Sequence, residues 1–152
     1  MSDQTAPSAE PNLMLRMQYL KDLSFENPLS PEIYSTLARS PDVSVNIDVT
    51  ARPLAAADDF EIVLAITASA KLEDKTVFVI ELTSGAVFQV AGFPKENLQP
   101  ILLIEIPRLM FPFARNIVAD VTRDSGFPPL LIHPVDFVAL YRQKFEVAAG
   151  QA

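Results

Sequence analysis

The residue types that perform most enzymatic chemistry are scarce in this chain. It has one histidine, His133, no cysteine, and four glycines scattered along the sequence. A lone histidine beside Pro134 fits a partly exposed loop residue better than a general base or a metal ligand. Without cysteine there is no thiolate nucleophile and no ordinary zinc site, and the glycine spacing matches no phosphate-binding loop. We expect neither an enzyme nor a metal or cofactor, and an unusual serine or aspartate catalyst stays open as an alternative.

Carboxylates are the most frequent ionisable groups. The chain has 19 Asp and Glu against 12 Lys and Arg, which gives a net charge of −7. The pair Asp58-Asp59 lacks the spacing of a calcium-binding loop and indicates a turn. Because a negative surface repels polyanions, the charge argues against nucleic acid and favours a partner with a basic segment.

Length and composition predict a single domain. The chain has 152 residues, of which 49% are hydrophobic and 20% charged, as in a folded globular protein with one core. The start, "MSDQTAPSAEP", shows no signal-peptide pattern, and no apolar run is long enough to span a membrane. We therefore expect a cytoplasmic protein with a domain at 12–146 and flexible tails at 1–11 and 147–152.

Four stretches alternate between apolar and polar residues, which is the period of a β-strand. They cover 13–26, 43–49, 60–72 and 77–90. Prolines prevent a regular element in the long connection between the first two, whereas the short connections between the last three predict antiparallel neighbours.

The alternation also predicts which side chains face the core. In the first strand, Met17 and Tyr19 are expected on the same face as Leu13 and Phe25. The last strand is expected to direct outward Val77, Val79 and Glu81.

From Leu98 onward the apolar residues recur every three to four positions, which predicts helices. Within "LMFPFARNIV", Pro112 is expected at the first position of a second helical stretch, where a missing N–H costs nothing and the helix bends. Gly126 should end this helix, and Asp136 should cap the last one. These elements predict an α+β fold: a four-stranded antiparallel sheet packed on two C-terminal helices, the first long and kinked.

Two segments, "QYLKDLSFENP" and "PRLMFPFARNIVADVTRDSGFPPLLIHPVDFVALY", together with the strands between them, resemble the SecB family of bacterial protein-export chaperones. The similarity extends from Leu13 to Tyr141. It implies a homotetramer, a dimer of dimers, that needs no ATP. Such a tetramer holds newly made secretory precursors in an unfolded, translocation-competent state and delivers them to the translocase motor SecA.

The resemblance also assigns residues. The acidic patch that receives the basic tail of SecA in the family matches Asp22, Glu26, Val79 and Glu81. Asp22 and Glu26 lie four apart in one predicted strand, so they share a face. Without the resemblance, this surface would be interpreted as an ordinary solvated sheet face.

A chaperone groove needs apolar side chains, because apolar burial is non-directional and tolerates many sequences. The candidates come from the long connection, the second strand and the last helix: Ile33, Tyr34, Leu37, Val43, Val45, Ile47, Phe137, Leu140 and Tyr141. The competing interpretation of each is an ordinary core residue. For contacts between subunits the candidates are Ile80, Leu82, Phe113 and Ile117, whose alternative is to cover their own sheet. A second function that stays open is an apolar small-ligand or lipid binding module.

Overall fold

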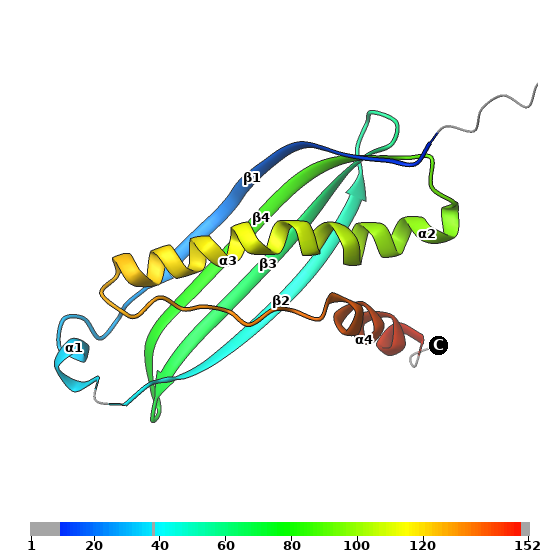
Figure 1. Ribbon diagram of the computed structural model, residues 1–152. Helices are drawn as coiled ribbons and strands as arrows, with labels where there is room; N and C mark the ends of the chain where they lie inside the picture. Colours follow the sequence, from blue (N-terminus) through cyan, green and yellow to red (C-terminus); the bar gives the residue numbers. More distant parts are fainter. Residues whose placement is uncertain (1–9, 38, 150–152) are drawn as a thin grey trace, which may run out of the picture.

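The computed structural model describes residues 10–37 and 39–149. One layer is a four-stranded sheet in which every neighbouring pair is antiparallel and the strand order is β1-β4-β3-β2 (Figure 1). Its strands are β1 (Asn12–Glu26), β2 (Asp42–Pro53), β3 (Asp59–Leu72) and β4 (Lys75–Ala91). All four predicted strands are therefore present, and Asp58, with a φ of 66°, lies in the predicted turn between β2 and β3.

Helices cover one face of this sheet. The segments α2 (Lys95–Pro100), η1 (Ile101–Glu105) and α3 (Ile106–Asp124) follow one another as a single long rod across the strands (Figure 1). An extended segment then leads to α4 (Phe137–Ala149), whose first turn is capped as predicted: the Ala139 N–H donates to Asp136 Oδ1 at 3.0 Å. The predicted α+β fold is confirmed.

Two details of the connections differ from the expectation. The proline-containing link between β1 and β2 holds a short helix, α1 (Ile33–Thr36). The helix α4 runs to Ala149, past the expected domain boundary at residue 146. Of the expected tails, residues 1–9 and 150–152 lie outside the described residues.

The long helix changes its geometry earlier than predicted. The Ile106 N–H bonds to the Ile101 carbonyl, five residues back, so the segment between them is a π-helix. Pro107 directly after it has no N–H to donate, and the wider turn accommodates this gap. Pro112 lies inside α3, so the prediction that it opens the second stretch was wrong; the proline in the first turn of α3 is Pro107, its second residue. Gly126, with a φ of 91°, follows the end of α3 as predicted.

The core lies between the helical rod and the inner face of the sheet. Its large, fully buried strand residues include Ile62, Leu64, Ile66, Ile80 and Leu82. They pack against buried residues of α3, Ile106, Met110, Ala114 and Val118. Burying a large aliphatic side chain of this kind stabilises the fold by about 1.5–3 kcal/mol.

Bulges change which residues of β1 face the core. The pairing of β1 with β4 shifts between Leu15 and Met17 and again between Leu20 and Asp22. Each shift inverts the alternation, so Met17 and Tyr19 lie on the outer face, contrary to the prediction, whereas Leu13 and Phe25 face inward. A further shift at the end of β3 brings Val77 into the core, although it was expected to point outward.

Candidate binding surfaces

The outer face of the sheet brings the four predicted docking residues together. Glu26 lies opposite Val79, Ser24 opposite Glu81, and Asp22 opposite Thr83 in the pairing of β1 with β4. The three carboxylates are exposed and Val79 is half-buried. The result is a flat acidic surface on two adjacent strands, suited to a basic partner.

The same face carries a buried carboxylate at its other end. Glu61 is only 6% exposed and accepts hydrogen bonds from the Tyr19 hydroxyl, from Lys21 Nζ at 3.3 Å and from Arg52 Nε at 2.9 Å. We call these four residues the Glu61 cluster. Burial of an ionised carboxylate is costly unless such partners satisfy it, and here β1 supplies two of them and β2 the third.

The cluster shifts two pKa values in opposite directions. The hydrogen bond from Tyr19, followed by those from Arg52 and Lys21, lowers the pKa of Glu61 to about 2 against the opposing effect of burial. Burial, together with the hydrogen bond to Glu61 and its negative charge, raises the pKa of Tyr19 to about 12. Glu61 is therefore charged and Tyr19 neutral over the physiological range.

Tyr19 fits the cluster because Gly85 lies beneath it. A Cβ atom at Gly85 would come within 2.5 Å of Tyr19 Cε2. Glycine at this position of β4 thus makes room for the tyrosine ring to lie across the strand. A glycine inside an otherwise regular strand pattern is the one sign of this contact in the sequence.

Two apolar cavities lie along β2 on the helix-covered face, with the side chains of Val45 and Ile47 between them, and we call this surface the apolar channel. At one end, Leu37, Pro41 and Val43 meet Phe127, Pro129 and Leu130 around a cavity of about 320 Å³. Val43 and Val45 remain 41% and 40% exposed, and β2 is an edge strand of the sheet.

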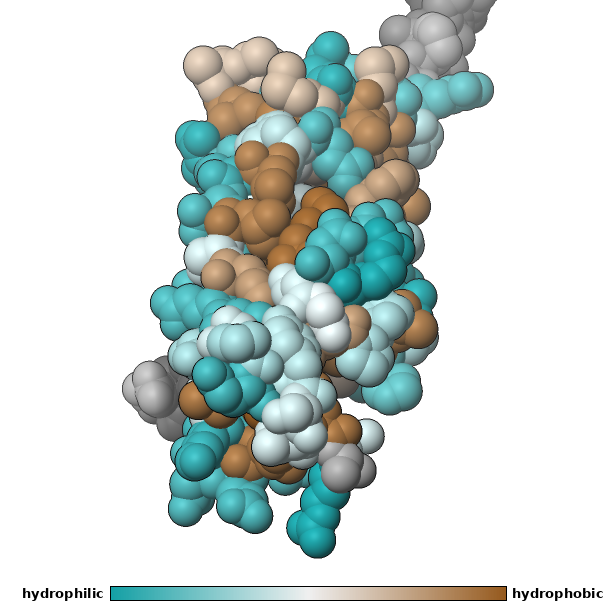
Figure 2. All heavy atoms as spheres, turned by 90° about the vertical axis from the view of Figure 1, so that its left-hand side faces the viewer, coloured by the Kyte–Doolittle hydropathy of each residue, from teal (hydrophilic) through white to brown (hydrophobic). Residues whose placement is uncertain are grey.

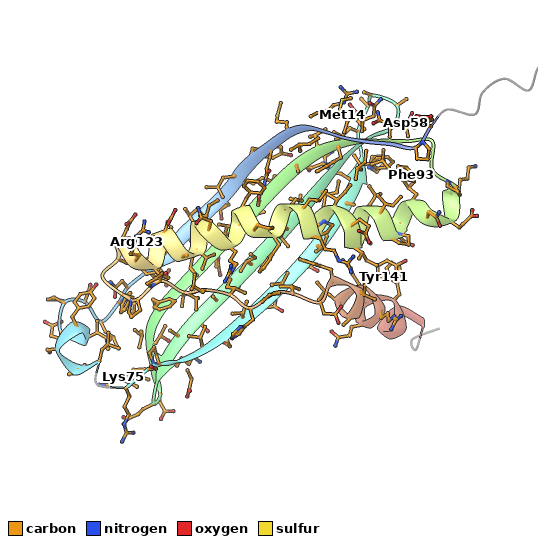
Figure 3. All side chains as sticks on the ribbon, in the orientation of Figure 1. Met14, Asp58, Lys75, Phe93, Arg123 and Tyr141 are labelled. Atoms are coloured by element: carbon orange, nitrogen blue, oxygen red, sulfur yellow. The ribbon has the colours of Figure 1, made fainter. Side chains whose placement is uncertain are left out.

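A second cavity, of about 350 Å³, lies at the other end of this channel, between β2, η1 and α4. Val49, Leu103, Leu140 and Tyr141 line it, and Tyr141 is labelled on α4 in Figure 3. Val43 and Val49 are six residues apart in one strand, so the two cavities are separated by about 20 Å. Val45 and Ile47 lie between them on the same face, opposite Ala68 and Ile66 of β3.

Not every predicted groove residue reaches this channel. Ile33 and Phe137 are 5% and 2% exposed and belong to the core, as the competing interpretation held. Tyr34 is 41% exposed, but its hydroxyl donates to the Ser125 carbonyl at 2.6 Å and so ties α1 to the end of α3. The opposite wall of the channel, which the segment 127–130 forms, was not predicted.

The predicted subunit-contact residues divide into two pairs. Ile80 and Leu82 are buried under their own helical layer, whereas Phe113 is 61% exposed and Ile117 half-buried. Phe113 lies with Leu109 and Leu15 around a cavity of about 310 Å³ between α3 and β1. Further large apolar residues of β1 are exposed nearby in sequence, namely Met14, Met17, Leu20 and Leu23. Figure 2 shows the molecule from the left of Figure 1. On the side in view, apolar side chains gather near the middle, among hydrophilic ones.

Other site types find no support in the part of the chain that the structure describes. No helix there is long and apolar enough to cross a membrane. No three His, Asp or Glu side chains of those residues lie close enough together to hold a metal ion. His133, the one histidine, is exposed in the extended segment before α4.

These features define a class of protein: an antiparallel sheet with one helix-covered face, an apolar channel along one edge and a polar outer face. Comparisons with known proteins identify the family. Residues 6–148 match the family model described as "Preprotein translocase subunit SecB". The chain belongs to the SecB family.

Individual relatives agree with this membership. The protein-export protein SecB of Afipia carboxidovorans is 49% identical over 99% of this chain and 96% of its own length. That of Rhodospirillum rubrum is also 49% identical, over 100% of this chain and 95% of its own length. Among solved structures, the Rv1957 SecB-like chaperone of Mycobacterium tuberculosis, in complex with a ChAD peptide from the HigA1 antitoxin, superimposes with a TM-score of 0.67. It covers 81% of this chain and 90% of that chain at 15% identity, so it supports the fold alone.

Proposed function

We propose that this protein is an ATP-independent export chaperone that holds newly made secretory precursors unfolded and delivers them to SecA. The observation that carries the proposal is the apolar channel along β2, which is open to solvent and long enough for an extended segment of polypeptide. Membership of a family whose relatives are named protein-export proteins supports it. The peptide in the SecB-like complex is a further parallel. Such a role places the protein in the cytoplasm, and it requires binding but no catalysis.

The channel suits clients of many sequences. Its walls are valine, leucine, proline and aromatic side chains, whose contacts with a client are not directional. Burial contributes roughly 25 cal/mol per Å², so affinity accumulates over an extended apolar segment without requiring a particular sequence. A binder of the unfolded state holds a client away from its native fold by mass action, which is why no ATP is needed.

Assembly into a homotetramer, a dimer of dimers, would multiply the effect. The exposed apolar residues that α3 and the helix-covered side of β1 bring together, Leu15, Leu109 and Phe113, are the surface that we assign to contacts between copies. Large exposed apolar patches of this kind are typical of interfaces. Several channels on one particle can then bind one long precursor, and modest affinities combine through effective concentration.

Delivery to the motor is assigned to the acidic outer face. Its exposed carboxylates Asp22, Glu26 and Glu81 share this face with the half-buried Val79 and are complementary to a basic, flat partner. Because this face lies on the opposite side of the sheet from the helical layer, a client and the motor can be bound together.

Client binding is tested with a reduced and carboxymethylated protein that cannot refold. Light scattering on a sizing column should show a tetramer that binds this unfolded protein and not its folded form. If the purified protein is monomeric and binds neither form, the chaperone proposal is wrong. Binding of a fluorescent fatty acid without binding of the unfolded protein would instead support the lipid-binding alternative.

Motor docking is tested by charge reversal. The double variant Asp22→Lys with Glu26→Lys should lose SecA binding at low salt but keep the tetramer and client binding. A matched control, Glu105→Lys with Asp124→Lys, makes the same charge change on the long helix, where both residues are exposed, and should keep SecA binding. Wild-type affinity of the first double variant would contradict the assignment.

A further inference from the structure

The two edges of the sheet differ in how well they could accept another strand. The edge strand β1 is interrupted by two bulges, which distort its pairing. The other edge strand, β2, pairs with β3 from Asp42 to Pro53 without a register shift. Within residues 10–37 and 39–149 no strand lies beyond it. A long, regular edge of this kind is a template for further strand pairing unless something protects it.

Lys144 of α4 protects one position of this edge. Its Nζ donates to the Val49 carbonyl at 2.8 Å and lies 3.6 Å from Asp48 Oδ1. A carbonyl that accepts from α4 faces away from β3, because the ladder lies on the other side of the strand. The N–H and C=O of one residue point to the same side of a strand, and the side alternates at each residue. The open side of β2 therefore carries the backbone groups of Val43, Val45, Ile47 and Val49.

The same four residues direct their side chains into the apolar channel. Val43 lines the first cavity, Val49 lines the second, and Val45 and Ile47 lie between them. A client strand that pairs with these groups lies beside β2 in the plane of the sheet, and its alternate side chains then point to the same side of the sheet as the channel. Backbone hydrogen bonds are as independent of client sequence as apolar burial is.

We propose that an extended client segment adds to the open edge of β2 as a further strand, and that Lys144 occupies the Val49 carbonyl until the client displaces it. Lys144 then has two roles. It prevents edge-to-edge association of empty molecules, for which lysine is well suited, and it returns to the carbonyl when the client leaves. This inference rests on the proposed chaperone function and specifies how the client is held.

Proline at Val45 separates backbone pairing from side-chain contact. Its N–H is on the open side, so Val45→Pro removes a donor to the client while the β2–β3 ladder stays intact. The matched variant Val45→Thr changes the side chain but keeps the N–H. We expect Val45→Pro to bind the carboxymethylated client at least about fivefold more weakly than Val45→Thr, the effect of one hydrogen bond. Equal affinities of the two variants would overturn the proposal, while client binding by the wild-type protein would leave the chaperone function intact.

Amide hydrogen exchange tests the same point on the unaltered protein. The amides of Val45 and Ile47 should exchange fast in the free protein and slow at least tenfold when the client is bound. The amides of Ser44 and Asn46, within the β2–β3 ladder, are the internal reference and should be slow in both states. Unchanged exchange at Val45 and Ile47 with bound client would also overturn the proposal, whether or not the proline variant folds.

The role of Lys144 is tested by Lys144→Met, which keeps an apolar stem of similar length and removes the ammonium group. Because the client no longer competes with the lysine, its affinity should rise about two- to fivefold. The empty protein should also associate at lower concentration in light scattering. A weaker affinity for the client would show that Lys144 supports client binding directly. It would refute the proposal that Lys144 competes with the client for the Val49 carbonyl.

Discussion

The two faces of the sheet are built from alternate residues of the same strands, yet they are stabilised by different forces. On the inner face, β3 contributes Ile62, Leu64 and Ile66, which the helical layer buries completely. On the outer face the same strand contributes Glu61, which three polar partners hold in place. Apolar burial needs only volume and shape, whereas the Glu61 cluster needs particular donors in a particular charge state. The inner face should therefore be sensitive to lost volume, and the outer face to lost charge and to pH.

The largest effect is expected on the inner face. Leu64→Ala removes a side chain that is 0% exposed and leaves a cavity that its neighbours cannot fill. It should lower the free energy of unfolding by about 2–5 kcal/mol. Urea denaturation at pH 7 measures this change, and it should be the same at pH 5. A loss below about 1 kcal/mol would mean that the core can repack around the gap.

A smaller effect is expected from Glu61→Ala on the outer face. It leaves Tyr19, Lys21 and Arg52 without their common acceptor, but Lys21 and Arg52 are partly exposed and can bind water instead. We expect a loss of about 1–3 kcal/mol in the same urea experiment. Arg52→Ala is the control, since it removes one donor from a side chain that is 64% exposed and leaves the other two bonds in place; its effect should be smaller. An equal effect of both variants would contradict the central position of Glu61.

The Glu61 cluster should also make stability depend on pH. The pKa of Glu61 is about 2 in the folded chain, against 4.5 for an unperturbed glutamate, so folding favours the carboxylate form. This contribution is complete above the ordinary pKa and is lost as the pH falls from 4.5 toward 2. Thermal unfolding of the wild type and of Glu61→Gln should therefore differ at neutral pH and converge in that acid range. Parallel pH profiles for the two proteins would show that Glu61 does not titrate as inferred.

The smallest stability change is expected from Gly85→Ala. The new methyl group would come within 2.5 Å of the Tyr19 ring, so the ring must shift and its hydroxyl leaves Glu61. Overpacking of this kind costs about 1–3 kcal/mol, and we expect the lower end because the Tyr19 ring that must move is only half-buried. In the double variant Gly85→Ala with Tyr19→Ala, the alanine at 85 should cost less than it does alone. Additive effects would show that Gly85 is needed for a reason other than Tyr19.

Local patterns in the sequence predicted much of the fold. The alternation in 43–49 and 60–72 and the cap at Asp136 depend only on neighbouring residues, and all appear in the structure. The inverted segment of β1 could not be predicted, because a bulge depends on how two strands pair and leaves the apolar count unchanged. The displacement of the helix break from Pro112 to Pro107 has a similar cause, since either proline could open a helical stretch and packing on the sheet selects one.

For the candidate surfaces too, some features could be predicted from local sequence and others depend on contacts between distant segments. Asp22, Glu26, Val79 and Glu81 come from two strands that the sequence predicts, and the pairing of β1 with β4 places them on one face. Whether they bind a motor is for the charge-reversal experiment to decide. The wall of the channel at 127–130 and the contact of Lys144 with Val49 were not predicted, because each joins segments far apart in the chain.

By itself the sequence determined the strands, the helices, the family resemblance and the acidic character of the chain. These follow from periodicity, local capping and composition, which act over a few residues. Only the tertiary structure decided that Tyr19 faces outward, that Phe137 is core rather than groove, and that β2 keeps an open edge beside an apolar channel. The physical reason is that burial and strand pairing are properties of segments brought together from a distance, which no local pattern contains.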